Sequence, residues 1–280
     1  MPDLTVAGRH VVARAEAALS AALDELGPRL VRTSGHVAFE PKSDGTPVTA
    51  ADRDVDDHLR HAIADAFPDH GLISEERDTV VPDAEWCWIV DPIDGTSNFL
   101  TGLPYWCVSV ALALDGEPVL GVVDAPALGA RYVASREGGA RRDARRLAVA
   151  PPVDWRDPRN GHVPVMLTTA TVRRARPAGV RLNPRIMGST ALDLAVVAEG
   201  VAAASLALVP KVWDVAAGWL LLREAGGAAV TLEGAPLLPL VAGEEHIGRT
   251  AVVGAGPNET YVRDLAAGLL SDEGTRRPEG

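Results

Sequence analysis

The feature that most constrains this chain is a short apolar run that ends abruptly in a polar cluster. Residues 86–91, Trp-Cys-Trp-Ile-Val-Asp, are nearly all apolar and either aromatic or branched, which predicts a buried strand. Pro92 fixes its own φ and keeps Asp91 out of the helical region, so the strand ends there. Gly95 allows a ligand to approach the backbone closely. Two carboxylates, Asp91 and Asp94, are therefore predicted at a strand's C-terminal end, where open α/β sheets bind ligands.

Composition and charge exclude several classes of protein. A chain of 280 residues with 47% hydrophobic and 23% charged residues is typical of a globular protein with one large domain or two subdomains. The net charge of −11 argues against nucleic acid as a general partner. Cys87 and Cys107 lie in apolar runs, as core thiols do in a reducing cytoplasm. The chain shows no signal peptide, and its longest apolar stretch, 195–209, is too short to span a bilayer, so we expect a cytoplasmic protein.

Hydrophobic periodicity predicts alternating helices and strands. We expect helices over about 4–30, 50–67, 191–199, 215–225 and 259–270, and strands over 105–114, 118–123, 132–134, 165–168, 202–209, 228–232 and 250–253. The Asp115-Gly116 pair predicts a hairpin turn, and Pro151-Pro152 marks the clearest boundary. We therefore predict an N-terminal α+β subdomain, 1–150, and a C-terminal α/β subdomain, 151–280.

Three further carboxylates stand at the ends of predicted elements. Asp52 falls in the first turn of a helix capped by Thr49, Glu75 follows a short Leu-Ile strand, and Asp214 takes an N-cap position. Each has an ordinary structural explanation when it is considered alone. Glu75 and Asp214 form with Asp91 and Asp94 a donor set made only of oxygen, which favours Mg²⁺ or Mn²⁺ over zinc.

The string Asp-Pro-Ile-Asp-Gly-Thr at 91–96 resembles a signature of the inositol monophosphatase family. Two more blocks follow the same family pattern in the same order. Ser-Glu-Glu at 74–76 resembles a Gly-Glu-Glu motif, with Ser74 in place of the usual glycine, and Trp-Asp at 213–214 is followed by Glu-Ala-Gly-Gly at 224–227. The resemblance covers residues 42–253. It implies a layered α/β (α+β) fold, a five-layer αβαβα sandwich, and a Mg²⁺-dependent phosphatase that forms a homodimer.

Carried over residue by residue, the resemblance implies two or three metal ions, Mg²⁺ with Mn²⁺ as a possible substitute. Glu75, Asp91 and the carbonyl oxygen of Ile93 would hold the first ion. Asp91, Asp94 and Asp214 would hold the second ion, and Asp52 would support a weaker third one through water.

The resemblance also implies how water and substrate are held. Glu75 and Thr96 would orient and deprotonate the attacking water, while the N–H groups of Gly95 and Thr96 bind the phosphate. Gly188, Ser189 and Thr190 match another family motif, and we expect them on the substrate side. Lys42 and Ser43 match a loop that covers the site in the family.

The substrate remains open at this stage, although its class is a small phosphate monoester. Inositol 1-phosphate is the family default. Histidinol phosphate is suggested by Thr-Pro-Val-Thr at 46–49 and by residues 121–128, and a 3′-phosphorylated nucleotide by residues 74–76 and 211–214. Ala207 stands where inositol-specific members carry a glutamate. A catalytically inactive relative with a binding or regulatory role is the alternative from another class.

Overall fold

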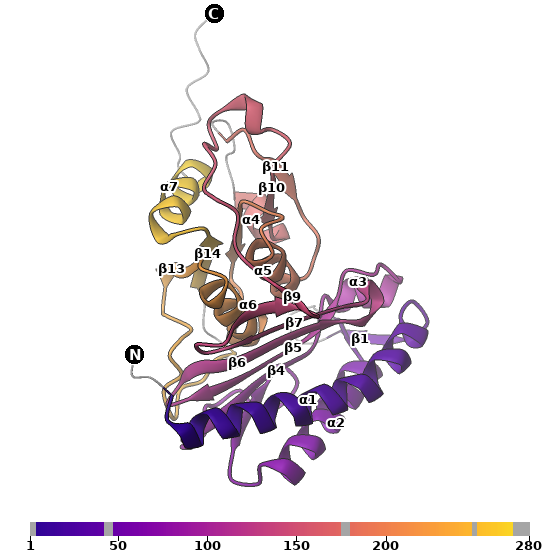
Figure 1. Ribbon diagram of the computed structural model, residues 1–280. Helices are drawn as coiled ribbons and strands as arrows, with labels where there is room; N and C mark the ends of the chain where they lie inside the picture. The colour runs from indigo at the N-terminus through magenta and orange to yellow at the C-terminus, as the bar shows by residue number, and fades with distance from the viewer. Residues whose placement is uncertain (1–3, 42–46, 175–179, 248–250, 271–280) are drawn as a thin grey trace, which may run out of the picture.

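The computed structural model describes residues 4–41, 47–174, 180–247 and 251–270, which build helices and two main sheets (Figure 1). The helices are α1 (Val6–Thr33), α2 (Ala50–Ala66), α3 (Thr96–Thr101), α4 (Thr169–Arg174), α5 (Thr190–Ala198), α6 (Val212–Glu224) and α7 (Glu259–Leu270), with 3-10 turns η1 (Pro126–Leu128) and η2 (Pro158–Asn160). None of the helices in the described ranges combines the length and the apolar character that crossing a membrane requires.

The larger sheet has seven strands in the order β3-β4-β5-β6-β7-β8-β9, in which β3 and β4 are parallel and the other neighbours antiparallel. These strands are β3 (Gly71–Ser74), β4 (Trp86–Asp94), β5 (Cys107–Leu114), β6 (Glu117–Ala125), β7 (Ala130–Ser135), β8 (Gly139–Arg142) and β9 (Arg145–Arg146). The predicted turn at Asp115-Gly116 joins β5 to β6 and is confirmed.

The smaller sheet has five strands in the order β11-β10-β12-β14-β13, in which β10 runs parallel to both of its neighbours. Its strands are β10 (Pro164–Leu167), β11 (Asn183–Arg185), β12 (Ala204–Leu208), β13 (Ala228–Gly234) and β14 (Ala251–Gly256). A separate pair, β1 (Phe39–Pro41) and β2 (Pro47–Thr49), leads into α2.

The helices and sheets stack in five layers, and three hydrophobic cores hold these layers together, which confirms the predicted sandwich. Helices α1 and α2 pack on one face of the larger sheet around Leu23, Leu59 and Trp88. Helices α5 and α6 fill the space between the two sheets, and α7 covers the outer face of the smaller sheet. Figure 1 shows α1 and α2 on one side of the larger sheet and α5 and α6 on the other. The site described below lies where the larger sheet meets α5 and α6.

The boundaries of two predicted helices differ in the structure. Helix α1 runs through Gly27 and Pro28 and ends at Thr33, three residues beyond its predicted end, because the burial of Leu26 and Leu30 outweighs the weak helix propensity of Gly and Pro. Helix α6 begins at Val212 with Lys211 as N-cap, so Asp214 lies in its first turn and is not the cap.

The two sheets draw their strands from either side of residue 150, yet α5 and α6 of the second half pack against the first sheet. The division into 1–150 and 151–280 therefore stays a prediction. The predicted strand 250–253 appears as β14, and its first residue, Thr250, lies outside the described residues. Within the Pro- and Arg-rich segment, the unpredicted strand β11 forms the edge of the smaller sheet.

Candidate active site

A bulge in β4 brings Asp91 and Asp94 to the same face of the larger sheet. Asp91 pairs with Ser109 and Asp94 with Cys107, so β4 advances three residues while β5 advances two. Pro92 lies in this step, where a residue without an N–H group is tolerated. Ile93 packs into the core that the larger sheet forms with α1 and α2. In a strand without the bulge, regular alternation of side chains would have turned Asp94 to that face instead. The extra residue thus turns both carboxylates toward α5 and α6.

The beginning of α5 binds Asp94 directly. One oxygen of Asp94, Oδ2, accepts hydrogen bonds from Ser189 Oγ at 2.7 Å and from Ala191 N at 2.6 Å. Ser189 Oγ also caps α5 by accepting from Leu192 N, so one side chain starts the helix and holds the carboxylate. The structure therefore places Ser189 against Asp94.

Glu75 and Asp214 approach the same place from two other elements. Glu75 directly follows Ser74, which pairs with Val90, and its N–H group donates to Val90 O at 3.2 Å. Asp214 Oδ2 accepts from Lys211 N at 2.8 Å in the first turn of α6. The hydroxyl of Ser109, the β5 partner of Asp91, donates to Trp213 O at 3.3 Å and ties this turn to the sheet.

Asp52 is a buried capping residue whose charge also reaches the site. Its Oδ2 accepts from Thr49 N at 2.7 Å and from Thr49 Oγ1 at 2.6 Å, which completes a capping box at the start of α2. Asp52 is thus a helix-capping residue, as its place in the sequence predicted, and capping does not conflict with an electrostatic role at the site. Its negative charge is among those that raise the pKa of Asp91.

Thr96 begins α3, and its hydroxyl donates to Ile93 O at 3.1 Å. Gly95 precedes it with φ +93°, and a Cβ there would lie 3.1 Å from Tyr105 O and 3.3 Å from Gly188 O. Only glycine fits this position, because the left-handed conformation and the close backbone leave no room for a side chain. Gly95 and Gly188 therefore lie side by side, as their predicted shared site requires. Thr190 follows as the first residue of α5.

The carboxylates of the site raise one another's pKa values. The pKa of Asp91 lies well above its usual range, mainly through burial and then through the charges of Glu75, Asp94 and Asp214. Burial likewise raises the pKa of Asp94 to about 6, although the hydrogen bond from Ser189 opposes the shift. The pKa of Asp214 is also well above normal, through burial and the charges of Asp94 and Glu75. Perturbed carboxyl groups from two elements, β4 and α6, that meet at one place are typical of a functional site.

The site fits a hard cation in its donor chemistry. Asp91 Oδ1 is buried and accepts no hydrogen bond from the described part of the chain. Leaving such an oxygen unsatisfied is costly, and a divalent cation would satisfy it. Among the described residues, no group of three or more His, Cys, Asp and Glu side chains is arranged so that it could hold a metal ion as it stands. Carboxylates repel one another, so a bound cation would have to draw these side chains together.

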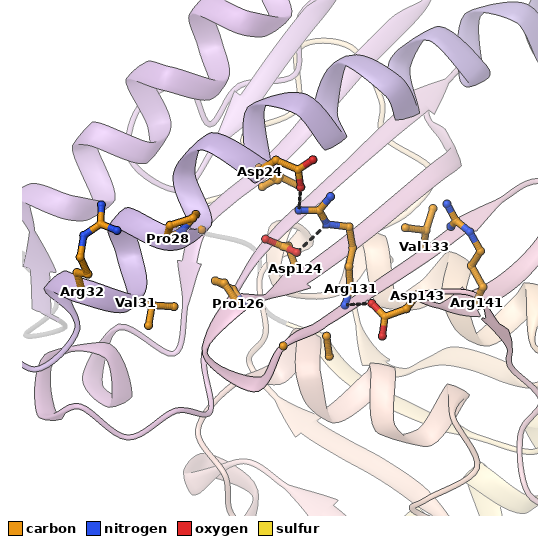
Figure 2. Close-up of a pocket in the computed structure, with 14 residues that line it drawn as sticks. Asp24, Pro28, Val31, Arg32, Asp124, Pro126, Arg131, Val133, Arg141 and Asp143 are labelled. Carbon is orange, nitrogen blue, oxygen red and sulfur yellow. Dashed lines mark hydrogen bonds and ion pairs between the residues drawn. The ribbon is translucent and has the colours of Figure 1, made fainter.

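A large pocket elsewhere does not coincide with these carboxylates. It has a volume of about 810 Å³ and lies between α1 and strands β6 to β8. Figure 2 shows Arg131 in it, pointing toward Asp24 and Asp124, which it contacts at 2.9 Å and 2.7 Å. This ion-pair cluster ties α1 to the sheet, and none of the predicted site residues lines the pocket.

Sequence reasoning missed Asp193 and Asn98, two residues that hold Tyr105 beside the site. Tyr105 OH donates to Asp193 Oδ1 at 3.0 Å inside the protein. Asn98 Nδ2 donates to both Tyr105 O and Met187 O. The signal for Asp193 was present, because it is a charged residue within an otherwise apolar helix. The predicted covering residues Lys42 and Ser43 lie outside the described part of the chain.

The layered fold and the clustered carboxylates define a phosphatase, a hydrolase of phosphoric monoesters, and sequence comparison agrees. The profile of the inositol monophosphatase family matches residues 6–266, so the chain belongs to this family. It is 38% identical to an inositol-1-monophosphatase of Mesorhizobium japonicum over 74% of this chain and 82% of the relative. It is 36% identical to a histidinol-phosphatase of Mycobacterium tuberculosis over 70% of this chain and 78% of the relative.

Solved structures share the fold. An IMPase of Thermotoga maritima has a TM-score of 0.72 and 28% identity, covering 85% of this chain and 89% of that one. An IMPase/NADP phosphatase complexed with Mg²⁺ and phosphate has a TM-score of 0.77 and 23% identity, covering 94% of this chain and 99% of that one. At this identity the second comparison shows the common fold alone.

Proposed function

We propose that this chain is a Mg²⁺-dependent phosphatase that hydrolyses a small phosphorylated metabolite. The observation that carries the proposal is the β4 bulge, which turns Asp91 and Asp94 to one face beside Glu75 and Asp214. Family membership and a donor set made only of oxygen support the choice of metal. Mn²⁺ has similar ligand preferences and is the expected substitute.

The proposed metal ligands follow from the site geometry and the family membership. Glu75, Asp91 and the carbonyl of Ile93 would hold one ion, and Asp91, Asp94 and Asp214 a second. The hydrogen bonds from Ser189 and Ala191 to Oδ2 hold the Asp94 carboxylate in place for such a role. Asp52 lies close enough to act on a third ion through its charge. When bound, these ions neutralise phosphoryl oxygens and make water acidic enough to lose a proton at neutral pH.

The chain's own groups would then orient the reaction. Glu75 and the Thr96 hydroxyl hold the attacking water, and Glu75 accepts its proton as the oxygen–phosphorus bond forms. The first N–H groups of α3 have no carbonyl partner within their helix, so Gly95 and Thr96 can donate to phosphate oxygens. The ester oxygen leaves in line as an alkoxide and takes a proton. Gly188 and Thr190 would flank the alcohol part of the substrate.

Relatives with different substrates leave the metabolite as the open part of the proposal. One relative is an inositol-1-monophosphatase and another a histidinol-phosphatase. Ala207 lies in β12 next to Val253, buried on the face toward α5 and α6, and offers no hydrogen-bond acceptor. We therefore favour a phosphate monoester other than inositol 1-phosphate, with histidinol phosphate and a 3′-phosphorylated nucleotide as first candidates.

We further propose that the protein works in the cytoplasm as a homodimer, without nucleic acid or membrane partners. The net charge of −11 and the two buried free cysteines, Cys87 and Cys107, support this proposal. Family membership supports the dimer, and light scattering of the purified chain tests it directly.

Phosphate release measured with Mg²⁺ and with excess EDTA tests the proposed activity. We expect release from at least one substrate in the panel, its loss in EDTA, and its return when Mg²⁺ is added again. The inactive-relative alternative predicts no release from any substrate even though the protein folds and binds Mg²⁺. The variant Asp91→Asn is the matched control, because it removes a proposed ligand and keeps the size of the side chain.

A further inference from the structure

The residue that replaces the family glycine in the Ser-Glu-Glu motif has a partner in α2. Ser74 is completely buried at the end of β3, and its Oγ accepts a hydrogen bond from Arg60 NH2 at 2.9 Å. The other two nitrogens of the same guanidinium donate to Asp56 Oδ2 at 2.8 Å and to Asp78 Oδ2 at 2.7 Å. Arg60 thus joins one helix to both ends of the turn that contains Glu75.

This connection is anchored inside the protein. The side chain of Asp56 is completely buried, and Arg77 Nε lies 3.2 Å from the same oxygen, Asp56 Oδ2, that Arg60 contacts. The turn is also closed by its backbone, since Ser74 N donates to Asp78 O at 3.0 Å. Charge-assisted hydrogen bonds with these distances are the stronger kind, and a buried carboxylate held by two arginines keeps them in place.

We infer that Arg60 is a positioning residue that fixes the turn 74–78 so that Glu75 stays beside Asp91. The inference rests on the proposed function, in which both carboxylates bind one cation. Before the cation binds, the two negative charges repel each other. A loose turn would let Glu75 move away, and metal binding would then have to draw it back. A braced turn removes that cost, so metal affinity depends on Arg60 although Arg60 touches no metal.

Calorimetric titration of Mg²⁺ into the EDTA-stripped and desalted full chain tests the inference without relying on catalysis. We expect Arg60→Met to raise the dissociation constant for Mg²⁺ by about tenfold or more, as the loss of outer-shell partners does. Ser74→Gly removes one of the three contacts and restores the family residue, so we expect a smaller rise. Turnover at saturating Mg²⁺ stays within about threefold of the wild type, because the reacting groups are unchanged.

Arg131→Met is the matched control, since Arg131 is similarly buried and also bridges two aspartates, but contacts neither Glu75 nor its turn (Figure 2). We expect it to leave the Mg²⁺ dissociation constant unchanged. An equal rise in Arg131→Met, or unchanged binding in Arg60→Met, overturns the positioning role. A wild-type chain that binds no Mg²⁺ overturns the proposed function itself. If Arg60→Met does not fold, Ser74→Gly and Asp78→Asn decide the question, and unchanged affinity in both overturns it.

Discussion

Asp91 combines full burial with an oxygen that accepts no hydrogen bond from the described residues, and the charges of four other carboxylates act on it. These conditions are unfavourable for a lone aspartate and favourable for a cation ligand. The sequence predicted Asp91 and Asp94 from the Asp-Pro-Ile-Asp-Gly-Thr string. It did not predict that an extra residue in β4 turns both to one face, because pairing with β5 determines that bulge.

We expect Asp91→Asn and Asp94→Asn each to reduce turnover by more than about 100-fold, beyond the usual effect of losing an outer-shell partner. Each change removes a proposed ligand and also a like charge. The melting temperature of the metal-free protein should therefore stay the same or rise. Phosphate release measures the loss of turnover, and thermal unfolding in EDTA measures the melting temperature of the metal-free protein. The exposed Asp83→Asn serves as a control, and near-normal activity of either site variant contradicts the assignment.

The variant Thr96→Ala tests whether the Thr96 hydroxyl acts in catalysis or only in the structure at the start of α3. The Thr96 hydroxyl contacts Ile93 O, a proposed ligand carbonyl, and begins α3. We expect kcat to fall by about 10²-fold or more, the range for groups that assist proton transfer. The Mg²⁺ dissociation constant, measured by calorimetry, should change much less. If kcat falls by less than about threefold, the Thr96 hydroxyl has no catalytic role and acts only at the start of α3.

At the scale of secondary structure elements, α5 carries two functions in its first turn. Its N-terminal residues hold Asp94, and Asp193 holds Tyr105. The sequence predicted the helix, since apolar runs are local signals. It placed Ser189 with the substrate and missed Asp94 as its partner, because that contact joins positions far apart in the chain. For the same reason Arg60 was not predicted as a partner of Ser74.

Ser189→Ala removes the helix cap and one of the two hydrogen bonds to Asp94 Oδ2. We expect a stability loss of about 1–3 kcal/mol, since a buried charged acceptor loses a donor. We also expect Mg²⁺ affinity to fall by about tenfold, because Asp94 is less firmly oriented. Urea unfolding and calorimetry measure the two effects. Ser189→Thr keeps the hydroxyl and is expected to restore both; failure to do so would contradict the role of the hydroxyl.

Asp193 gives α5 a pH-dependent stability in the metal-free protein. Burial raises the pKa of Asp193 well above its usual range, and nearby Asp94 adds to the shift, although the Tyr105 hydrogen bond opposes it. A raised folded pKa stabilises the native state below the unfolded pKa of about 3.9, and this contribution is lost as pH rises through the folded pKa. Asparagine does not titrate. We therefore expect Asp193→Asn to gain stability relative to the wild type as pH rises.

Thermal unfolding of both proteins in EDTA from about pH 4 upward measures this difference, which should be smallest near the unfolded pKa. A difference that stays constant with pH would show that Asp193 does not titrate as described. The variant keeps an acceptor for Tyr105, so the comparison isolates the charge.

At the scale of the whole molecule, three cores hold five layers, and the site lies where the middle core meets the larger sheet. Hydrophobic periodicity and turn residues predicted most elements, and family resemblance predicted their order in layers. The sequence alone did not predict how α6 starts. Ser109 ties the first turn of α6 to β5, so the helix begins at Val212 and Asp214 lies inside it. Contacts between layers thus decide the positions of the ligands.

The proposed substrate preference rests on Ala207. It is buried in β12 beside Val253 and has no side-chain acceptor for the hydroxyl groups of a polyol ring. Sites that select a hydroxylated ligand depend strongly on such acceptors. We expect a higher kcat/KM for histidinol phosphate or a 3′-phosphorylated nucleotide than for inositol 1-phosphate, measured side by side at saturating Mg²⁺. Ala207→Glu should improve inositol 1-phosphate relative to the others if the chain folds with it. A preference of the wild type for inositol 1-phosphate by about tenfold or more would show that Ala207 does not limit recognition.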